Sequence, residues 1–196
     1  KSIDLDFFTS THFRPELFLS KIKDCFDEVD LELLEKETII LFLSPEKIQF
    51  SLFYFPYKEI SPKNYVTIGK SIKCPVASLY DIAAMKAVAI SQRGSIKDFI
   101  DLFFILLELD LNFSGVLELV QRKYELKTRY EYQLKTSFVY FDDAETEFDQ
   151  IVMLQKGFEG TRLTRKEWEA MKNFFRKYVR YLVFFTRIYF FTGRYV

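Results

Sequence analysis

The sequence predicts an α+β protein, with a small mixed β-sheet followed by a mostly helical C-terminal half. β-Branched and aromatic runs lie before Pro75, whereas apolar residues after it recur at helical spacing. The 196 residues are 49% hydrophobic and 18% aromatic, which is enough for a sizeable core and argues against a disordered chain. We expect two domains, with the sheet in residues 1–75 and the helices in residues 76–196.

The first half contains the expected strands. Ile3–Phe8 is predicted as a strand, and residues 14–28 as an amphipathic helix because their apolar side chains recur at helical spacing. Thr38–Leu43 and Ile48–Phe55 are β-branched and aromatic, and the Ser-Pro-Glu-Lys sequence between them predicts a hairpin turn. A further short strand is expected at Val66–Ile72.

The second half carries helical patterns. Helices are predicted over Ala77–Arg93 and Ser95–Leu109, interrupted by Gly94, and over Ser114–Tyr124. The pattern of Tyr130–Phe141 is ambiguous.

The last predicted helix begins near Thr164, because Thr164 and Glu167 have the spacing of a capping box. Its apolar face is expected to contain Trp168, Met171, Phe175, Tyr178 and Leu182. From Arg162 to Arg194 there are nine Lys or Arg residues and two Glu residues. This stretch either binds an RNA backbone and stacks on its bases, or forms a helix with a solvated basic face. We favour the solvated helix.

Composition also limits the classes of function. Basic and acidic residues balance at 28 each, so net charge gives no argument for nucleic acid. Cys25 and Cys74 have no metal-like spacing and are interpreted as reduced thiols of a cytoplasmic protein. The single histidine, His12, is expected in a loop and argues against a histidine-rich zinc site or a His-based triad. No signal peptide is visible, and arginines interrupt the apolar segment Tyr178–Val196, so we expect no membrane span.

The opening sequence KSIDLDFF carries two aspartates inside an apolar stretch. In a strand, Asp4 and Asp6 point to one side together with Ser2, and the apolar residues between them to the other. Two close carboxylates repel each other, and burying them is costly without a cation between them. Mg²⁺ prefers carboxylate oxygen and is the simplest compensation. The alternative is an edge strand with solvated aspartates.

A second group of charges lies between Asp81 and Leu102, among alanines and large apolar residues. It consists of Lys86, Arg93, Lys97, Asp98 and Asp101. If one helix runs through Gly94, Arg93, Lys97 and Asp101 lie within about 60° of Lys86, and Asp98 lies about 120° away. If Gly94 breaks the helix, the angles on its two sides are independent. Lys97 and Asp101 also have the spacing of an ordinary exposed ion pair.

The motifs SxDLDFF, KxxAxxxR and KDxxDL, in this order, resemble the AbiEii toxin family of nucleotidyltransferases, in the DNA polymerase β-like superfamily. The resemblance covers Lys1–Leu109 and, more loosely, the helix with Trp168. It implies transfer of NMP from an NTP to an acceptor hydroxyl, with Mg²⁺ or Mn²⁺ as cofactor. It also implies a toxin–antitoxin setting with a cognate antitoxin and, in some members, tRNA as the acceptor.

The resemblance implies roles for the carboxylates. Asp4 and Asp6 bind metal, and strand geometry is consistent with this role. Asp101 is the third carboxylate, either as a metal ligand or as the acceptor of the hydroxyl proton. Asp98 takes this place if Gly94 breaks the helix.

The resemblance also implies a nucleotide-binding set. Lys86 neutralises triphosphate charge, and Arg93 and Lys97 do the same or hold the helix against the strand. Ser2 contacts phosphate or is only a strand-end residue. Family members carry a Gly-Ser or Gly-Gly turn before the aspartate strand, and the sequence begins at Lys1 without it. We expect either an upstream segment outside this sequence or a catalytically inactive member that binds a partner protein or RNA.

Overall fold

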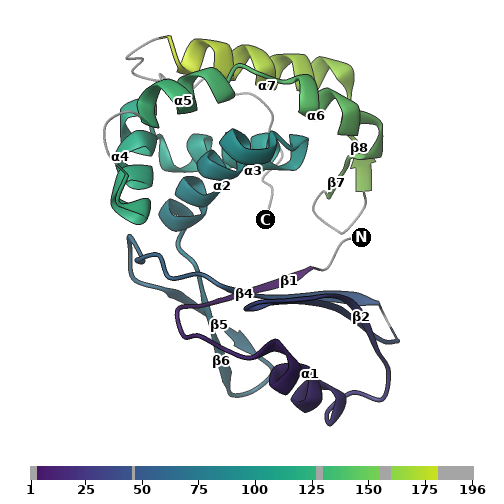
Figure 1. Ribbon diagram of the computed structural model, residues 1–196. Helices are drawn as coiled ribbons and strands as arrows, with labels where there is room; N and C mark the ends of the chain where they lie inside the picture. Colours follow the sequence, from purple (N-terminus) through teal and green to yellow (C-terminus); the bar gives the residue numbers. More distant parts are fainter. Residues whose placement is uncertain (1–3, 46, 127–129, 155–159, 181–196) are drawn as a thin grey trace. The chain divides into compact units, whose positions relative to one another are not determined.

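The computed structural model describes residues 4–45, 47–126, 130–154 and 160–180 (Figure 1). The chain divides into two compact units, Lys1–Tyr57 and Lys58–Val196. The predicted α+β class, a small mixed sheet followed by helices, is confirmed. The predicted domain boundary after residue 75 stays a prediction.

The first unit is a four-stranded sheet with one helix. Its elements are β1 (Leu5–Thr9), α1 (Pro15–Lys23), β2 (Val29–Glu35), β3 (Thr38–Leu43) and β4 (Ile48–Tyr54). The strand order is β1-β4-β3-β2, with β1 parallel to β4 and the other neighbours antiparallel. β1 is therefore an edge strand of a mixed sheet.

Strand alternation places the core of the first unit on one face of this sheet. Ile39, Leu41 and Leu43 of β3 are buried, and every second residue of this strand faces α1. Phe18 of α1 stacks on Phe50 of β4, with ring centroids 5.9 Å apart. Helix α1 therefore covers this face of the sheet.

In the first unit, one prediction needs correction and one strand was missed. The helix α1 ends at Lys23, before the predicted end at residue 28, because the chain turns there to enter β2 at Val29. Strand β2 was not predicted, and its alternation is interrupted by a register shift between Leu31 and Leu33.

The second unit opens with a two-stranded hairpin, β5 (Asn64–Ile68) and β6 (Ile72–Val76). The predicted single strand at Val66–Ile72 is wrong. Its centre is a turn in which Gly69 adopts a φ of 61°, a conformation that glycine permits at little cost.

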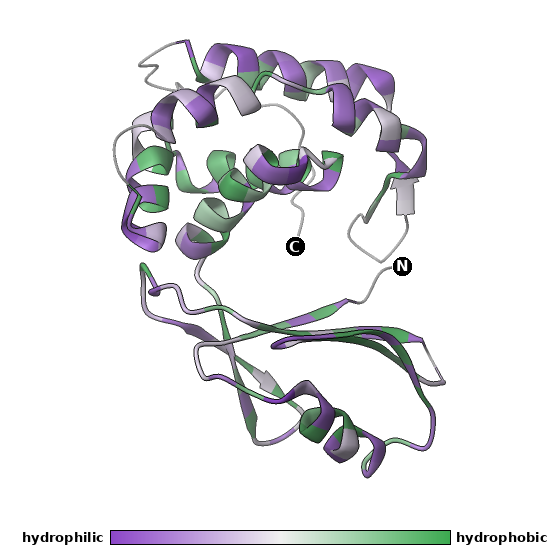
Figure 2. Cartoon of the chain, in the orientation of Figure 1, coloured by the Kyte–Doolittle hydropathy of each residue, from purple (hydrophilic) through white to green (hydrophobic). Residues whose placement is uncertain are grey.

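In the described part of the second unit after this hairpin, most elements are helices, joined by one 3₁₀ turn and one further short hairpin. The elements are α2 (Leu79–Arg93), α3 (Ile96–Leu109), α4 (Phe113–Tyr124), α5 (Tyr130–Ser137), α6 (Asp142–Glu147), η1 (Phe148–Gln150), β7 (Val152–Leu154), β8 (Gly160–Arg162) and α7 (Arg165–Tyr178). Figure 2 shows mostly hydrophobic residues along α3 and many hydrophilic ones along α7. The fully buried Phe99 of α3 packs against Phe175 and Trp168 of α7. Helix α3 is thus central to the core of this unit.

The capping box at the start of α7 is confirmed. The Thr164 hydroxyl accepts from the backbone N–H of Glu167, and the Glu167 carboxylate accepts from the backbone N–H of Thr164. The predicted apolar residues of α7 up to Tyr178 are buried, and Leu182 lies outside the described residues.

Cys25 and Cys74 are both free. In the described ranges, no helix is both long enough and apolar enough to cross a membrane.

Candidate functional site

The junction between α2 and α3 determines the geometry of the second charged group. Gly94 ends α2 in the left-handed conformation, with a φ of 60° and its N–H bonded to the carbonyl of Ile90. Ser95 is the N-cap residue of α3. One helix does not run through Gly94, so the helical angle that favoured Asp101 over Asp98 does not apply.

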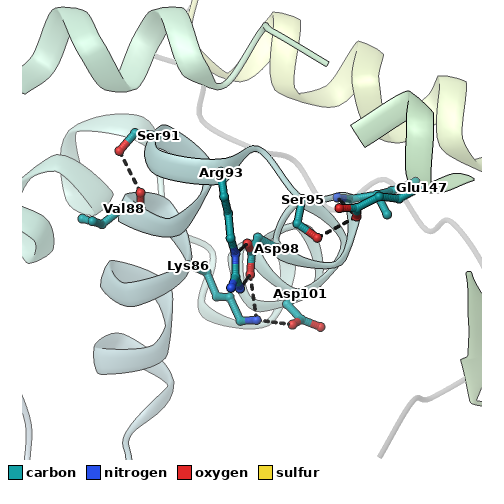
Figure 3. A network of polar contacts seen from close by, with 9 residues as sticks. Lys86, Val88, Ser91, Arg93, Ser95, Asp98, Asp101 and Glu147 are labelled. Atoms are coloured by element: carbon teal, nitrogen blue, oxygen red, sulfur yellow. Dashed lines mark hydrogen bonds and ion pairs between the residues drawn. The ribbon is translucent and has the colours of Figure 1, made fainter. Parts of the chain in front are cut away.

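A distant carboxylate fixes the start of α3. The Glu147 side chain accepts from the Ser95 hydroxyl at 2.7 Å and from the Ile96 N–H at 3.0 Å (Figure 3). A carboxylate at a helix N-terminus satisfies an N–H that lacks a partner in the helix and interacts favourably with the helix dipole. We did not predict this contact, and no local pattern indicates it because the partners are 51 and 52 residues apart.

Asp98 and Asp101 both contact the Lys86 ammonium. The Lys86 Nζ atom lies 3.0 Å from Asp98 Oδ1 and 2.7 Å from Asp101 Oδ2 (Figure 3). Arg93 binds Asp98 through two hydrogen bonds, from Nε to Oδ2 at 2.7 Å and from Nη2 to Oδ1 at 2.9 Å. Two cations of α2 are therefore joined to two carboxylates of α3.

Burial differs strongly within this Lys86 network, by which we mean Lys86, Arg93, Asp98 and Asp101. The Asp98 side chain is fully buried, that of Lys86 is 25% exposed, and that of Asp101 is 50% exposed. Burial alone raises the pKa of Asp98, but the hydrogen bonds and charges of Arg93 and Lys86 outweigh it and hold the pKa below its ordinary value.

The same balance acts on the lysine. Burial lowers the pKa of Lys86, but its hydrogen bonds and charge interactions with Asp101 and Asp98 outweigh burial and raise the pKa above its ordinary value. Lys86 therefore carries its charge at neutral pH, as a group that binds phosphate needs to.

Lys97, another predicted nucleotide-binding residue, takes no part in the Lys86 network. Lys97 is exposed on α3, and within the part of the chain that the structure describes it forms no ion pair. Ser2 lies outside the described residues.

Asp4 and Asp6 belong to the first unit, and the Lys86 network to the second. Asp6 is exposed on the edge strand β1, in register with Ser51 of β4, and the exposed Asp4 immediately precedes β1. In the described ranges, no group of three or more metal-binding side chains occurs. Mg²⁺ commonly takes one or two protein carboxylates and completes its shell with water and phosphate oxygens. The donor chemistry of Asp4 and Asp6 therefore fits this ion.

His12 lies in the loop between β1 and α1, as predicted. Its Nδ1–H donates to the Glu37 carboxylate, and its ring stacks on Tyr54 with centroids 4.2 Å apart. These contacts tie the loop to the β2–β3 turn and to the end of β4, which gives the side chain a structural role.

A buried ion pair positions the start of α2. The Asp81 carboxylate accepts from Lys123 Nζ at 2.7 Å, from the Ser78 hydroxyl at 2.6 Å and from the Ile60 N–H at 2.9 Å. Both charged side chains are buried, and these contacts join α2, α4 and the segment before β5. This cluster is structural, because its charges are already satisfied inside the protein.

The basic stretch that begins at Arg162 is only partly described, since it continues beyond residue 180. On α7, Arg165 and Lys172 both pair with the Glu145 carboxylate, which also accepts from the Trp168 indole N–H. These two cations stabilise the packing of α6 on α7.

Two features are consistent with the nucleotidyltransferase class that the motifs indicate. The first unit is a small mixed sheet with an aspartate on its edge strand, and the helical unit contains the lysine–carboxylate network. A family model described as "Nucleotidyl transferase AbiEii toxin, Type IV TA system" matches residues 1–181, and the chain belongs to this family. A protein of Aquifex aeolicus (strain VF5), "Uncharacterized protein aq_aa25", is 32% identical over 180 residues, which are 91% of this chain and 78% of that protein. No solved structure matches the chain.

Proposed function

We propose that this protein is a Mg²⁺-dependent nucleotidyltransferase that moves NMP from an NTP to a hydroxyl of RNA, with tRNA as the expected acceptor. The proposal rests mainly on one observation, namely that two carboxylates of α3 bind the Lys86 ammonium. Lys86 is the lysine of the KxxAxxxR motif, and Asp98 and Asp101 are the aspartates of KDxxDL, in a chain of the AbiEii family.

In this function Asp4 and Asp6 hold the metal ion. Bound to carboxylates, Mg²⁺ supplies positive charge that stabilises the oxygens of the reacting phosphates. Asp101, whose side chain is half exposed, serves as the third carboxylate. It acts either as a further metal ligand or as the acceptor of the proton that leaves the attacking hydroxyl.

Lys86 neutralises negative charge on the triphosphate. The oxygen of the acceptor hydroxyl forms a bond to the α-phosphorus, and the bond from this phosphorus to the bridging oxygen breaks, so that pyrophosphate leaves. Because charge gathers on the phosphoryl oxygens in the transition state, a fixed ammonium accelerates the reaction mainly by electrostatic stabilisation. Arg93 supports this role by its two hydrogen bonds to Asp98.

The family description supplies the biological setting. The family is that of a toxin in a type IV toxin–antitoxin system. We propose that this chain is the toxin of such a pair and that a cognate antitoxin counteracts it.

Transfer of label from NTP to RNA tests the activity. The full-length protein is incubated with each α-labelled NTP, Mg²⁺ and total tRNA, and labelled RNA is resolved on a gel. We expect transfer by the wild type and a loss of at least about 100-fold in Asp6→Asn and Lys86→Ala, because each removes charge stabilisation from the transition state.

Two substitutions serve as matched controls. Asp30→Asn removes an exposed carboxylate from the opposite edge strand, β2, and Lys135→Ala removes a partly exposed lysine from α5. Both are expected to retain transfer. Absence of transfer by the wild type with every NTP, or equal transfer by Asp6→Asn, contradicts the proposal and favours a family member that only binds a partner.

A further inference from the structure

The two carboxylates that hold Lys86 are not equivalent. Asp98 has no exposed side-chain surface, whereas half of the Asp101 side chain is exposed. Both belong to α3, one turn apart, and both accept from the same ammonium (Figure 3). The sequence spacing alone does not distinguish their roles.

Both oxygens of Asp98 are engaged. Oδ1 accepts from Lys86 at 3.0 Å and from Arg93 Nη2 at 2.9 Å, and Oδ2 accepts from Arg93 Nε at 2.7 Å. Separating Asp98 from its two cationic partners is costly, because the buried carboxylate would be left with an uncompensated charge. Asp98 therefore stays in place and orients the two cations.

Asp101 is held more loosely. Its Oδ2 contacts Lys86 at 2.7 Å, and water reaches half of its side chain. A half-exposed ion pair is weak because water stabilises the separated charges almost as well. Asp101 can therefore leave Lys86 without leaving a carboxylate stranded in the interior.

Charge balance in the network also bears on anion binding. Lys86 and Arg93 contribute two positive charges, and Asp98 and Asp101 two negative ones, so the four groups together are neutral. A triphosphate that approaches Lys86 meets the Asp101 carboxylate at the ammonium and is repelled by it. When Asp101 leaves Lys86, Asp98 keeps one of the three ammonium N–H donors, and the other two can bind phosphate.

We propose that, in the nucleotide-free protein, Asp101 occupies the position on Lys86 that a triphosphate oxygen takes, and that it moves away from Lys86 when nucleotide binds. Asp98 remains bound throughout and is the positioning residue for Lys86. This inference rests on the proposed function. It assigns Asp101 a second role, because the same carboxylate becomes available to the reaction only after phosphate has replaced it.

Binding without divalent metal tests the exchange, because Asp101 then has no metal to bind. Inorganic tripolyphosphate and ATP are titrated into the wild type, Asp101→Asn, Asp101→Ala, Asp98→Asn and Lys86→Ala in EDTA, and heat is measured by calorimetry. Both Asp101 variants are expected to bind tripolyphosphate and ATP about fivefold more tightly than the wild type, because a competing charge is gone. In the transfer assay the same variants should lose kcat while KM for NTP falls.

Asp98→Asn is the matched comparison, since it removes the same charge from the same lysine. It is expected to bind tripolyphosphate more weakly than the wild type, because Lys86 and Arg93 lose their common anchor. Circular dichroism establishes that each variant is folded. If Asp98→Asn does not fold, the two Asp101 variants still decide the question.

The outcomes separate the two proposals. If the wild type binds neither probe, or if Lys86→Ala binds both as well as the wild type, the proposed role of Lys86 fails. If binding depends on Lys86 but the Asp101 variants bind no more tightly than the wild type, the exchange alone is wrong. Tighter binding by Asp98→Asn and the Asp101 variants alike also overturns the exchange, because charge removal at either position would then suffice.

Discussion

Asp81 and Lys123 show how much one buried charge depends on its partner. Both side chains are almost inaccessible to water, and the carboxylate pairs with the ammonium at 2.7 Å. Removing the cation leaves a buried carboxylate whose remaining side-chain partners, among the described residues, are the Ser78 hydroxyl and the Ile60 and Ser61 N–H groups. These neutral donors compensate part of the lost charge interaction.

We expect Lys123→Ala to lower the free energy of unfolding by about 3–5 kcal/mol, the usual cost of removing one member of a buried ion pair. Urea denaturation measures this change. Lys58→Ala is the matched control, because the nearby Lys58–Glu125 pair has side chains that are 77% and 67% exposed and should matter little. Equal changes in the two variants would show that burial does not decide the contribution.

The carboxylates of α3 show how far residue-level prediction from sequence extends. The motifs indicated Lys86, Arg93, Asp98 and Asp101 as a group, and the structure joins all four. The sequence did not reveal that Asp98 is buried and Asp101 half exposed, since this depends on where α3 packs. It also placed Lys97 in the group, whereas this side chain points to solvent.

At the level of elements, Gly94 controls the angle between α2 and α3. Its φ of 60° is unfavourable for other residues, and a Cβ atom at this position would lie 3.3 Å from Asp143 Oδ2. Gly69, in the exposed hairpin turn, has nearly the same φ of 61° but no atom within 4 Å of such a Cβ. The two glycines differ mainly in their surroundings.

We expect Gly94→Ala to lower the free energy of unfolding by about 1–2 kcal/mol, the cost of left-handed backbone in a residue with a Cβ atom, and somewhat more where Asp143 has to shift. Gly69→Ala should show the backbone cost alone. Thermal denaturation of both variants measures the difference. A smaller effect at Gly94 than at Gly69 would mean that α6 accommodates the methyl group freely.

Elements with strong local signals were predicted well. The helices before and after Gly94 begin and end within about two residues of the predicted positions, because glycine and serine mark their common boundary. The hairpin of β5 and β6 was mistaken for one strand because both of its halves are apolar near the turn. The six-residue helix α6 was missed, since its acidic sequence has no apolar period.

The contact between Glu147 and the start of α3 could not be predicted from local sequence patterns. Ser95 and Glu147 are 52 residues apart, so their hydrogen bond depends on the packing of α6 beside α3. Tertiary packing, which no short window of sequence encodes, therefore determines this part of the candidate site's support.

Considered as a whole, the molecule concentrates its perturbed carboxylates in the second unit. Asp81, Asp98 and Glu145 are each subject to burial, which raises the pKa, but the hydrogen bonds and charges of their cationic and polar partners lower each pKa below its ordinary value. The unfolded chain therefore takes up protons at higher pH than the folded chain does.

These three groups make the stability of the second unit dependent on pH. Their contribution is complete above the ordinary pKa values, 3.8 for aspartate and 4.5 for glutamate, and is lost as the pH falls through the lower pKa values of the folded state. We expect the free energy of unfolding to decrease with falling pH in this acidic range. Urea denaturation between neutral pH and pH about 3, followed by circular dichroism, measures the slope.

Asp98→Asn should flatten this slope, because it removes one group that binds its proton more readily in the unfolded chain. A slope identical to that of the wild type would show that Asp98 does not contribute to acid sensitivity.

The indole of Trp168 is the only one in the chain. It is fully buried among Phe99 and Phe141, and its N–H is bonded to Glu145. Its fluorescence therefore reports on the interior of the second unit alone, and the first unit contributes no tryptophan emission. The protein thus contains a natural optical probe that distinguishes loss of the helical core from loss of the sheet, without any added label.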